Sequence, residues 1–518
     1  MRKHYIVAYD LGTTGTKAVL VDVDWGIIQT FFVPYKTNYP APTWAEQNPM
    51  DWWRAVVLGT QGLLQAAKIS ADQIACLAFS GQMMGCVPLG KDGTPLRNAI
   101  IWADQRAVEQ TERLLEKVGL EQAYRITGHR IGPAYSAPKM MWLKEREPHV
   151  FRQVYKFLQA KDFVVHKLTE VWVTDPSDAS GTGLFDIKTL SWSEVMVKAA
   201  GIPPELLPEV RPSVDVVGEV TYKAAQETGL VPGTPVVIGG GDGVCATAGA
   251  GVVQPGIGHV YLGSSAWVAG ASVEPLFDPQ MRTFTWPHLS PQLYSPNGTM
   301  HNAGSSLEWA SDTLCMLEKK LAEWLGLSPY DFIEQRAEKV RPGSEGLLFL
   351  PYLMGERSPL WNPNARGVFL GLTRKHELAH LLRAVYEGVA LNLRTIFLAL
   401  QEVGAEFATM RVIGGGAMSR LWTRILADVL GMPLQITAAP LEATSIGAAM
   451  AGAVGVGLAP NFEVVAARFV TIRESVEPGP ARIFYSHLHR VFVDAYAALT
   501  DVFERLVLLE ENTGDGSR

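Results

Sequence analysis

Residues 9–19 read YDLGTTGTKAV, and the organisation of the whole chain can be worked out from this stretch. An apolar run from Tyr5 to Tyr9 leads into it and a second run leaves it from Lys17, so the pattern predicts two strands joined by a glycine-rich tip. Inward-turned backbone N–H groups at such a tip form an anion-binding concavity, and small hydroxyl side chains add donors. The tip therefore fits a phosphate group. It consists of Gly12, Thr13, Thr14 and Gly15.

The same order of motifs occurs a second time. Residues 258–270, GHVYLGSSAWVAG, again place a small hydroxyl-rich turn between two apolar stretches. Each tip is followed by an apolar strand that ends in three glycines, GGGDG at 239–243 and GGGAM at 414–418. Helical patterns such as 378–398 alternate with the strands, which is typical of α/β domains. The repetition predicts a duplicated domain with both tips facing a common cleft. The second tip consists of Gly263, Ser264 and Ser265.

The expected boundary between the two copies lies near Gln254-Pro255-Gly256. We expect an N-terminal domain over 1–253, a C-terminal domain over 254–490, and a helix end with a polar tail over 491–518. From tip to triple glycine the first copy is about 76 residues longer than the second. Substrate contacts are expected in that insertion.

Two aspartates stand where chemistry could occur. Asp10 precedes the first tip, where a carboxylate would repel a bare phosphate, so we assign it to Mg²⁺, through water, rather than to turn initiation. Asp242 follows three glycines at a strand end, where a ligand could approach the backbone closely. It is a candidate general base for an attacking hydroxyl and a second group near the Mg²⁺, the alternative being a helix N-cap. The second triple glycine, at 414–418, lacks the carboxylate and suits a flat nucleobase.

Aromatic residues near charged side chains suggest a sugar site. Trp102 lies in IIWADQRA, close to Asp104 and Arg106, and sugar hydroxyls bind carboxylate and guanidinium groups beside an apolar face. Other tryptophans, among them Trp52 and Trp53, are expected in the core, as most aromatic residues are.

Two motifs match known sites without fitting them. GCVPLGKD (85–92) has the P-loop spacing, but an aspartate replaces the Ser/Thr that binds Mg²⁺, so a hairpin turn is expected. His376-Glu377-Leu-Ala-His380 has the HExxH pattern without a third ligand at a familiar spacing, so a solvated helix start is expected.

Composition excludes several classes of partner. The formal charge of −7 and the lack of a Lys/Arg cluster argue against nucleic acid. No segment approaches twenty uninterrupted apolar residues, and the amino terminus carries no long apolar stretch, so we expect a cytoplasmic protein with no membrane contact. The four cysteines lie far apart without a CxxC pair, so reduced, structural thiols are expected.

The motifs together resemble the FGGY family of carbohydrate kinases, within the actin-like ATPase superfamily. The resemblance covers nearly the whole chain, in order: DLGTTGTK, GGGD, LGSSA, GGGAMSRLWTRILAD and GVFLGLTRKHELAHLLRAVYE. Further stretches, namely AEQNPMDWW, SGQMMG, IWADQRA, PSDASGTGLFD and LPYLMGERSPLWNPNARG, are closer to the xylulokinases of that family.

The resemblance implies two ribonuclease-H-like domains closing on ATP, Mg²⁺ and a sugar, with Asp242 as general base on a primary hydroxyl. Near the transferring phosphoryl group it implies Thr13, Thr14 and Lys17. Near the nucleotide phosphates it implies Gly263, Ser264 and Ser265. By the adenosine it implies Gly414, Gly415, Gly416 and Ser419. Near the sugar it implies Gln82, Met83, Met84, Trp102, Asp104, Asp242 and Gly243.

Two departures bear on the sugar. Xylulokinases read GQMHG and GGGDN where this chain has Met84 and Gly243, so an imidazole and an amide are missing. Losing a polar partner can shift discrimination by powers of ten, which leaves another ketopentose, a tetrulose or a polyol open beside D-xylulose. Glycerol kinases have Arg-Glu at Met83-Met84, which disfavours glycerol.

Two other functions use the same phosphate tips. One is an actin-like ATPase that works as a conformational machine, which would add a peptide-binding domain after the ATPase core; here the additional length lies inside the first copy. The other is a sugar sensor without turnover, which the presence of Asp10 and Asp242 disfavours. A homodimer is expected from the resemblance alone.

Overall fold

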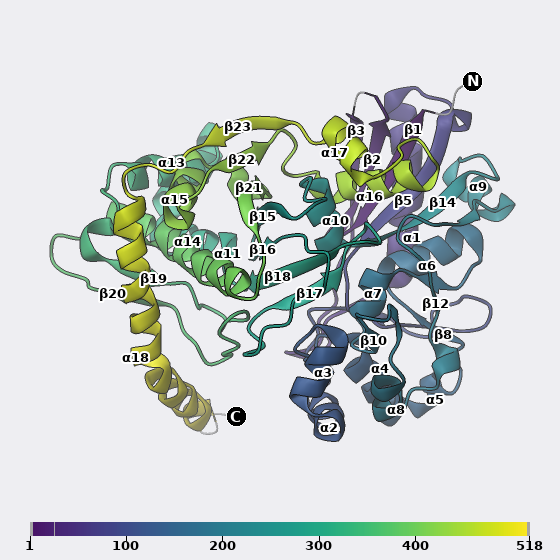
Figure 1. Cartoon of the computed structure of the whole chain (residues 1–518), viewed down its shortest axis with the longest axis horizontal. Coiled ribbons are helices and arrows are strands. Elements are labelled where there is room, and N and C mark those ends of the chain that lie inside the picture. Colours follow the sequence, from purple (N-terminus) through teal and green to yellow (C-terminus); the bar gives the residue numbers. More distant parts are fainter. Residues whose placement is uncertain (1–3, 25, 515–518) are drawn as a thin grey trace. The chain divides into compact units, whose positions relative to one another are not determined.

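Two units organise the chain (Figure 1). The computed structural model describes residues 4–24 and 26–514. The first unit consists of Met1–Pro255, Ala271–Pro296 and Glu442–Thr471. The second unit consists of Gly256–Gly270, Asn297–Leu441 and Ile472–Arg518.

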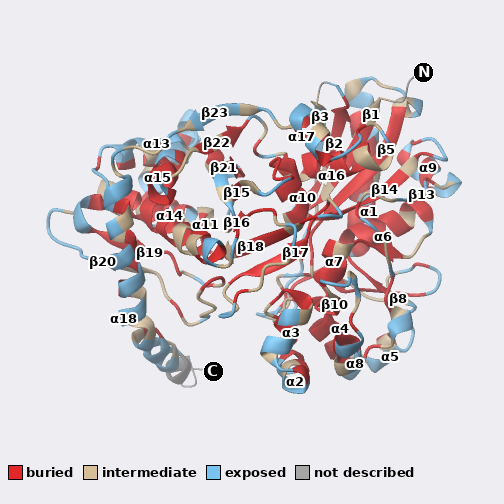
Figure 2. Cartoon of the chain, viewed as in Figure 1, coloured by how far each residue is buried: buried red, intermediate tan, exposed pale blue. Residues whose placement is uncertain are grey.

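A six-stranded sheet forms the centre of the first unit, in the order β13-β14-β5-β1-β2-β3. β1, β2 and β3 form an antiparallel meander, whereas β5 pairs with β1 and β14 pairs with β5 in parallel. Every residue of β5 is buried, as expected for an apolar strand in the interior of a sheet (Figure 2). The predicted hairpin around the first tip is confirmed. The strands are β1 (Tyr5–Leu11), β2 (Gly15–Asp22), β3 (Gly26–Pro34), β5 (Ile74–Gly81), β13 (Val216–Glu219) and β14 (Pro235–Gly241).

Helices pack on this sheet and fill the insertion. α1 begins where the Asn48 side chain accepts a hydrogen bond from Met50 N, with Pro49 in the first turn. Trp52 and Trp53 of this helix are buried, which confirms them as core residues. The helices are α1 (Pro49–Ala67), α2 (Val108–Val118), α3 (Leu120–Thr127), α4 (Ser136–Arg146), α5 (Pro148–Phe151), α6 (Ala160–Thr169), α7 (Pro176–Ser180), α8 (Glu194–Ala200), α9 (Tyr222–Thr228), α10 (Asp242–Gly249), α16 (Ala443–Gly455) and α17 (Phe462–Phe469).

The connections of the first unit contain short strands. They pair in twos, as β4 with β7, β6 with β8, β9 with β12 and β10 with β11. The segment 271–296 also contains one more strand, which is the edge strand of the second large sheet. They are β4 (Glu46–Gln47), β6 (Val87–Leu89), β7 (Ala99–Ile100), β8 (Lys156–Leu158), β9 (Val173–Thr174), β10 (Phe185–Asp186), β11 (Ser191–Trp192), β12 (Glu209–Val210) and β17 (Phe284–Pro287).

The sheet of the second unit repeats the strand succession of the first. It has seven strands, in the order β17-β18-β16-β15-β21-β22-β23. β18, β16 and β15 are antiparallel neighbours, and β21 and then β22 follow β15 in parallel, before the antiparallel β23. Three antiparallel strands followed by two parallel ones is the ribonuclease-H-like order, so the predicted duplicated α/β fold is confirmed. The strands are β15 (Gly256–Leu262), β16 (Ala266–Ala269), β18 (Tyr294–Met300), β21 (Phe407–Ile413), β22 (Leu434–Thr437) and β23 (Ile472–Val476), with a separate pair β19 (Leu348–Leu350) and β20 (Val368–Leu370).

Long helices accompany the second sheet. The helix expected over 378–398 is α14, and the helical carboxyl-terminal stretch is α18, while the tail residues 515–518 lie outside the described residues. The helices are α11 (Gly304–Leu314), α12 (Met316–Leu325), α13 (Pro329–Glu338), α14 (Leu378–Glu402), α15 (Arg420–Leu430) and α18 (Arg482–Gly514).

The units differ from the ranges 1–253, 254–490 and 491–518 expected from the sequence, because residues 271–296 and 442–471 belong to the first unit. α16 packs against α10 so closely that a Cβ at Gly249 would overlap the Ala443 carbonyl, and a Cβ at Gly447 would overlap the Cys245 carbonyl. Glycines on both helices permit this backbone contact.

The remaining expectations on composition can be compared with the structure. All four cysteines are free and buried, which confirms structural thiols. Among the residues described, no helix has both the length and the apolar character needed to cross a bilayer.

His129 in the first unit gives a testable pH dependence. Its ring lies 4.1 Å from the Trp286 ring and its Nε2 2.7 Å from Ser180 Oγ. Burial lowers the pKa of His129 to about 3, below the ordinary 6.5, so the unfolded chain binds this proton more tightly. Stability from this residue is complete above pH 6.5 and is lost as the pH falls from 6.5 toward 3.

We expect His129→Phe to flatten the dependence of the unfolding free energy on pH between 6.5 and 4, by up to about 1.4 kcal/mol per pH unit. Urea unfolding at a series of pH values measures this slope. His149→Gln, at an exposed position, is the control and should leave the slope unchanged. An unchanged slope in His129→Phe would contradict the assignment.

Candidate active site

The first tip has the predicted hairpin geometry. Gly12 N donates to Gly15 O at 3.0 Å, which closes the turn, and Tyr35 OH donates to Gly12 O at 2.5 Å. Thr13 is half-buried and Thr14 is exposed, so their hydroxyls can reach a ligand. A Cβ at Gly15 would overlap the Phe32 ring of β3, which is why only glycine fits there.

Asp10 and Asp242 lie at the ends of two strands that flank β5. Asp10 pairs with Ser80 of β5, and Gly241, the residue before Asp242, pairs with the neighbouring Gly81. Both carboxylates are half-buried. The register of a single strand therefore brings them together.

Their electrostatics fit both proton transfer and a hard cation. Burial, and next the negative charge of Asp10, raise the pKa of Asp242 to about 7. Burial also raises the pKa of Asp10, opposed by the Ser80 hydroxyl at 3.1 Å and by the charge of Lys17. Two adjacent carboxylates offer the oxygen ligands that Mg²⁺ prefers, and a cation there would relieve their repulsion.

The triple glycine before Asp242 has a different physical role from the one expected. A Cβ at Gly239 would overlap the Phe79 carbonyl, a Cβ at Gly240 would lie 2.5 Å from Leu289, and a Cβ at Gly241 would overlap Met83. The space is filled by the protein rather than left for a ligand. Gly243, by contrast, has open space where its Cβ would be. Asp242 is the first residue of α10 and not its N-cap, which is Gly241.

The loop after β5 contributes three of the expected substrate residues. Gln82 is buried, and its Nε2 donates to Gln47 Oε1 at 2.8 Å, while Gln47 Nε2 donates to Thr13 O at 2.6 Å. Gln82 is therefore connected through Gln47 to the backbone of the first tip. Met83 is buried against Gly241, and Met84 is half-buried with a left-handed φ of 61°.

Trp102 and Asp104 have different surroundings. Trp102 is 38% exposed and its Nε1 donates to Thr13 Oγ1 at 2.9 Å, which places the indole beside the first tip. Asp104 is fully buried and accepts from Ala45 N at 2.6 Å and from Arg106 Nη2 at 2.7 Å. The structure therefore brings Trp102 to the tip and turns Asp104 toward Arg106.

Sequence reasoning missed Lys139 of α4, which holds two of these segments and the loop before α4. Its Nζ donates to Met84 O at 2.9 Å, to Ile101 O at 2.7 Å and to Ala134 O at 2.6 Å. Ile101 directly precedes Trp102. Burial lowers the pKa of Lys139 to about 7. A lysine inside the otherwise apolar stretch 137–143 was the one signal that could have identified it.

The second tip is held by backbone hydrogen bonds within the second unit. Gly263 N donates to Ser265 O at 2.9 Å, and Ser264 O accepts from Ala303 N at 2.9 Å. The side chain of Ser264 is exposed. A Cβ at Gly304 would lie 2.5 Å from Gly263 O, so the first turn of α11 packs directly on the tip.

The second triple glycine leaves one open backbone position. Gly414 has φ 85°, and Cβ atoms at Gly414 and Gly416 would lie 2.5 Å and 2.6 Å from atoms of Leu262. Gly415 has nothing within 4 Å of its Cβ position. Ser419 caps α15 by accepting from Trp422 N at 3.0 Å.

The two motifs set aside in the sequence are structural. Gly93 N donates to Gly90 O, which confirms a hairpin turn at the apparent P-loop. Glu377 is the N-cap residue of α14 and His376 Nδ1 accepts from Thr373 N at 3.0 Å, which confirms a helix start at the HExxH pattern.

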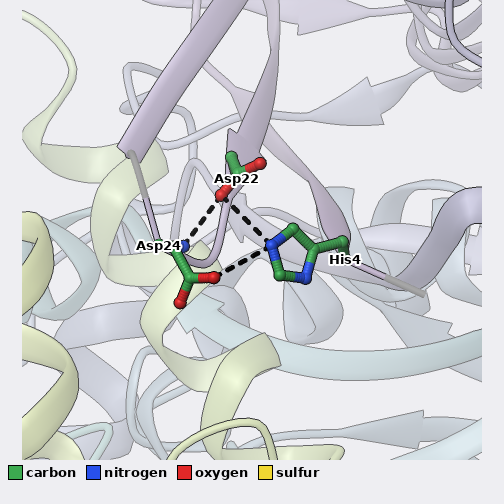
Figure 3. Close-up of side chains that lie close together, drawn as sticks. All are labelled: His4, Asp22 and Asp24. Atoms are coloured by element: carbon green, nitrogen blue, oxygen red, sulfur yellow. Dashed lines mark hydrogen bonds and ion pairs between the residues drawn. The ribbon is translucent and has the colours of Figure 1, made fainter. Parts of the chain in front are cut away.

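His4, Asp22 and Asp24 form a separate polar cluster (Figure 3). His4 Nε2 lies 3.0 Å from Asp24 Oδ2 and 3.7 Å from Asp22 Oδ1, and the three ligand atoms lie within 4.8 Å of one another. One Asp22 oxygen already accepts from Asp24 N at 2.8 Å. We interpret the cluster as one histidine between two carboxylates, since His4 directly precedes β1, Asp22 ends β2 and Asp24 follows β2. It lies at the opposite end of the hairpin from Asp10.

Comparison with known proteins identifies both halves of the chain. The family model described as "FGGY family of carbohydrate kinases, N-terminal domain" matches residues 5–249, and the corresponding C-terminal domain model matches residues 258–456.

Individual relatives cover nearly the whole chain. A gluconokinase from Bacillus licheniformis is 32% identical over 503 residues, 97% of each protein. A xylulose kinase from Bacillus subtilis (strain 168) is 32% identical over 502 residues, 97% of this chain and 96% of that protein. The crystal structure of ligand-bound xylulose kinase from Lactobacillus acidophilus superposes with a TM-score of 0.89 at 28% identity, covering 97% of this chain and 99% of that one.

The packing role of the triple glycine predicts unequal effects of two alanine substitutions. Gly239→Ala adds a Cβ that overlaps the Phe79 carbonyl at a φ of 69°, so it should lower the unfolding free energy by about 2–4 kcal/mol. Gly243→Ala adds a Cβ in open space on α10, so its effect should stay within about 1 kcal/mol. Denaturant unfolding of both variants measures the difference. Equal losses of unfolding free energy in the two variants would show that a Cβ at Gly239 does not overlap the Phe79 carbonyl.

Proposed function

The chain belongs to the FGGY family of carbohydrate kinases, and we propose that it transfers the γ-phosphate of ATP to a primary hydroxyl of a small sugar, with D-xylulose as the first candidate. The observation that carries this proposal is the position of Asp242. A half-buried carboxylate, beside a second one at Asp10 and with its pKa raised to about 7, is suited to accept the proton of a hydroxyl at neutral pH.

Asp242 acts as the general base in this proposal. Its Oδ1 accepts from Gly243 N at 2.7 Å, which orients the carboxylate and leaves the second oxygen for the substrate. As the primary hydroxyl oxygen attacks the γ-phosphorus of ATP, its proton moves to Asp242, the bond from this phosphorus to the β,γ-bridging oxygen breaks, and ADP leaves. Met83 is buried against Gly241, next to this base. The carboxylate needs no covalent step, because phosphoryl transfer depends on positioning and charge neutralisation.

The first tip contributes donors for the phosphoryl group. The hydroxyls of Thr13 and Thr14 and the ammonium group of Lys17 would contact its oxygens, and Lys17 lies 3.8 Å from Glu442, which limits its freedom. Asp10 and Asp242 would hold Mg²⁺, directly or through water. When bound there, the cation would neutralise charge on the phosphates.

The second unit supplies the nucleotide contacts in this proposal. The exposed Ser264 at the second tip has free space for phosphate oxygens, and the open backbone at Gly415 suits a flat base. Ser419, as a helix cap, fixes the turn that follows the glycines. ATP as the donor makes the cytoplasm the expected compartment, and the homodimer expected from the sequence stays a prediction.

D-gluconate is the second candidate substrate, because a gluconokinase and a xylulose kinase are equally similar to this chain at 32% identity. Neither candidate is favoured by Met84 and Gly243, which provide no polar side chain for a hydroxyl or a carboxylate. Another ketose or a polyol stays a third candidate for the same reason.

A panel of acceptors tests the function and the substrate. ADP release with ATP–Mg²⁺ is followed through a coupled assay for D-xylulose, other ketopentoses, tetruloses, D-gluconate, polyols and glycerol, with a reaction lacking acceptor as control. We expect kcat/KM to be highest for D-xylulose. A clear preference for D-gluconate or another acceptor would contradict D-xylulose as the substrate but would support the kinase activity. Turnover that no acceptor stimulates would favour the conformational ATPase, and no turnover with sugar binding would favour the sensor.

Removing the base tests the role of Asp242. Asp242→Asn retains the acceptor for Gly243 N but cannot take a proton, so kcat should fall by about 10²–10⁴-fold. The dissociation constant of ATP, measured by calorimetry, should change little. Asp92→Asn, at an exposed turn, is the control and should keep full activity. Activity that survives in Asp242→Asn would assign the base to another residue.

A further inference from the structure

Three aspartates surround one lysine in the interior of the first unit. Lys161 Nζ lies 2.7 Å from Asp162 Oδ1, 2.8 Å from Asp175 Oδ1 and 3.0 Å from Asp178 Oδ2. None of the four side chains is more than 1% exposed. Burial raises the pKa of the Asp178 carboxyl well above its usual range, while the positive charge of Lys161 opposes this shift. A desolvated ion cluster of this kind requires further hydrogen bonds to hold its members in place.

Asp175 extends the cluster toward the strand β14. It is the N-cap of α7, and its Oδ2 accepts from Ser177 N at 2.9 Å and from Ser177 Oγ at 2.5 Å. The same oxygen accepts from Ser213 Oγ at 3.0 Å. Because the Ser177 hydroxyl donates its only proton to Asp175, its lone pairs are directed away from the cluster and can accept.

The donor that Ser177 receives is the backbone amide before the proposed base. Gly241 N donates to Ser177 Oγ at 2.9 Å. Gly241 ends β14 and caps α10, whose first residue is Asp242. Ser177 and Gly241 are both buried, so water does not replace this bond. A continuous chain of contacts therefore runs from Lys161 through Asp175 and Ser177 to the peptide that carries Asp242.

We infer that Ser177 is a positioning residue for Asp242, a step that rests on the proposed function. The orientation of the Gly241 peptide decides where the Asp242 side chain leaves the backbone. On one side that peptide is fixed by β5 and on the other by Ser177, whose hydroxyl is fixed in turn by the buried Asp175. Without the serine hydroxyl, Gly241 N has no acceptor, and the Asp242 carboxylate is no longer held in the orientation that the reaction needs. Every group that contacts substrate is still present.

Two serine variants test this inference in the full-length protein. Ser177→Ala removes the acceptor of Gly241 N and should lower kcat by about 10–100-fold, with the KM for ATP within about twofold of the wild type. Ser213→Ala is the matched control, because it removes a hydrogen bond to the same Asp175 oxygen without touching Gly241. Its kcat should stay within about twofold. Equal losses in both variants, or no loss in Ser177→Ala, would overturn the positioning role.

Hydrogen–deuterium exchange gives a second readout that needs no turnover. The peptide covering residues 238–245 should take up about one additional deuteron in Ser177→Ala and none in Ser213→Ala. Unchanged exchange in Ser177→Ala would overturn the inference by itself. If the wild type phosphorylated no acceptor, the proposed function would be wrong, and the exchange result would still decide whether Ser177 holds Gly241.

A third variant, Ser177→Cys, keeps the inference testable if Ser177→Ala does not fold. Ser177→Cys keeps the shape of the side chain but replaces the hydroxyl with a weak acceptor. Its kcat and its exchange should lie between those of the wild type and of Ser177→Ala. A cysteine variant with wild-type kcat and increased exchange would separate the two properties and would contradict the link between the Gly241 contact and catalysis.

Discussion

Strand β5 is the constraint on which the candidate site depends. It pairs in parallel with β1 on one side and with β14 on the other, so its register alone sets Asp10 and Asp242 side by side. Burial, and next the negative charge of the adjacent Asp10, then raise the pKa of Asp242 toward neutrality. Gly239 is needed for the same reason, because any side chain there would push β14 away from Phe79 of β5. Sheet pairing thus produces the electrostatics.

Buried lysines fix the loops that the sheet does not reach. Lys139 donates to three carbonyl oxygens that are up to 55 residues away in sequence, and Lys161 gathers three aspartates. Burying an ammonium group is costly unless every proton has an acceptor, so each lysine holds its partners in one arrangement. Rigid loops of this kind pre-organise a site before substrate arrives, which lowers the entropy lost when the ligand binds.

The sequence allowed the duplicated fold, both tips and the two aspartates to be predicted, because each depends on a local pattern of glycines, hydroxyls and β-branched residues. It did not reveal Lys139 or the link from Ser177 to Gly241, since their partners are distant in sequence and no spacing rule connects them. The association of residues 442–471 with the first unit was missed for the same reason. It depends on glycines in α10 and α16 that meet only after folding. The open space expected at the triple glycine was an error of the same origin, because Leu289 and Met83 fill it.

Two of the expected substrate positions are held by backbone contacts and not by their side chains, which bears on substrate choice. The left-handed backbone at Met84 is held by Lys139 at its carbonyl, and Gly85 N donates to Gln159 Oε1 directly after it. None of these contacts involves the Met84 side chain. Gly243 likewise has open space at its Cβ position. Residues at these two positions can therefore differ among related kinases without a change in the loops or in Asp242, so the acceptor can change while the phosphoryl-transfer machinery stays the same.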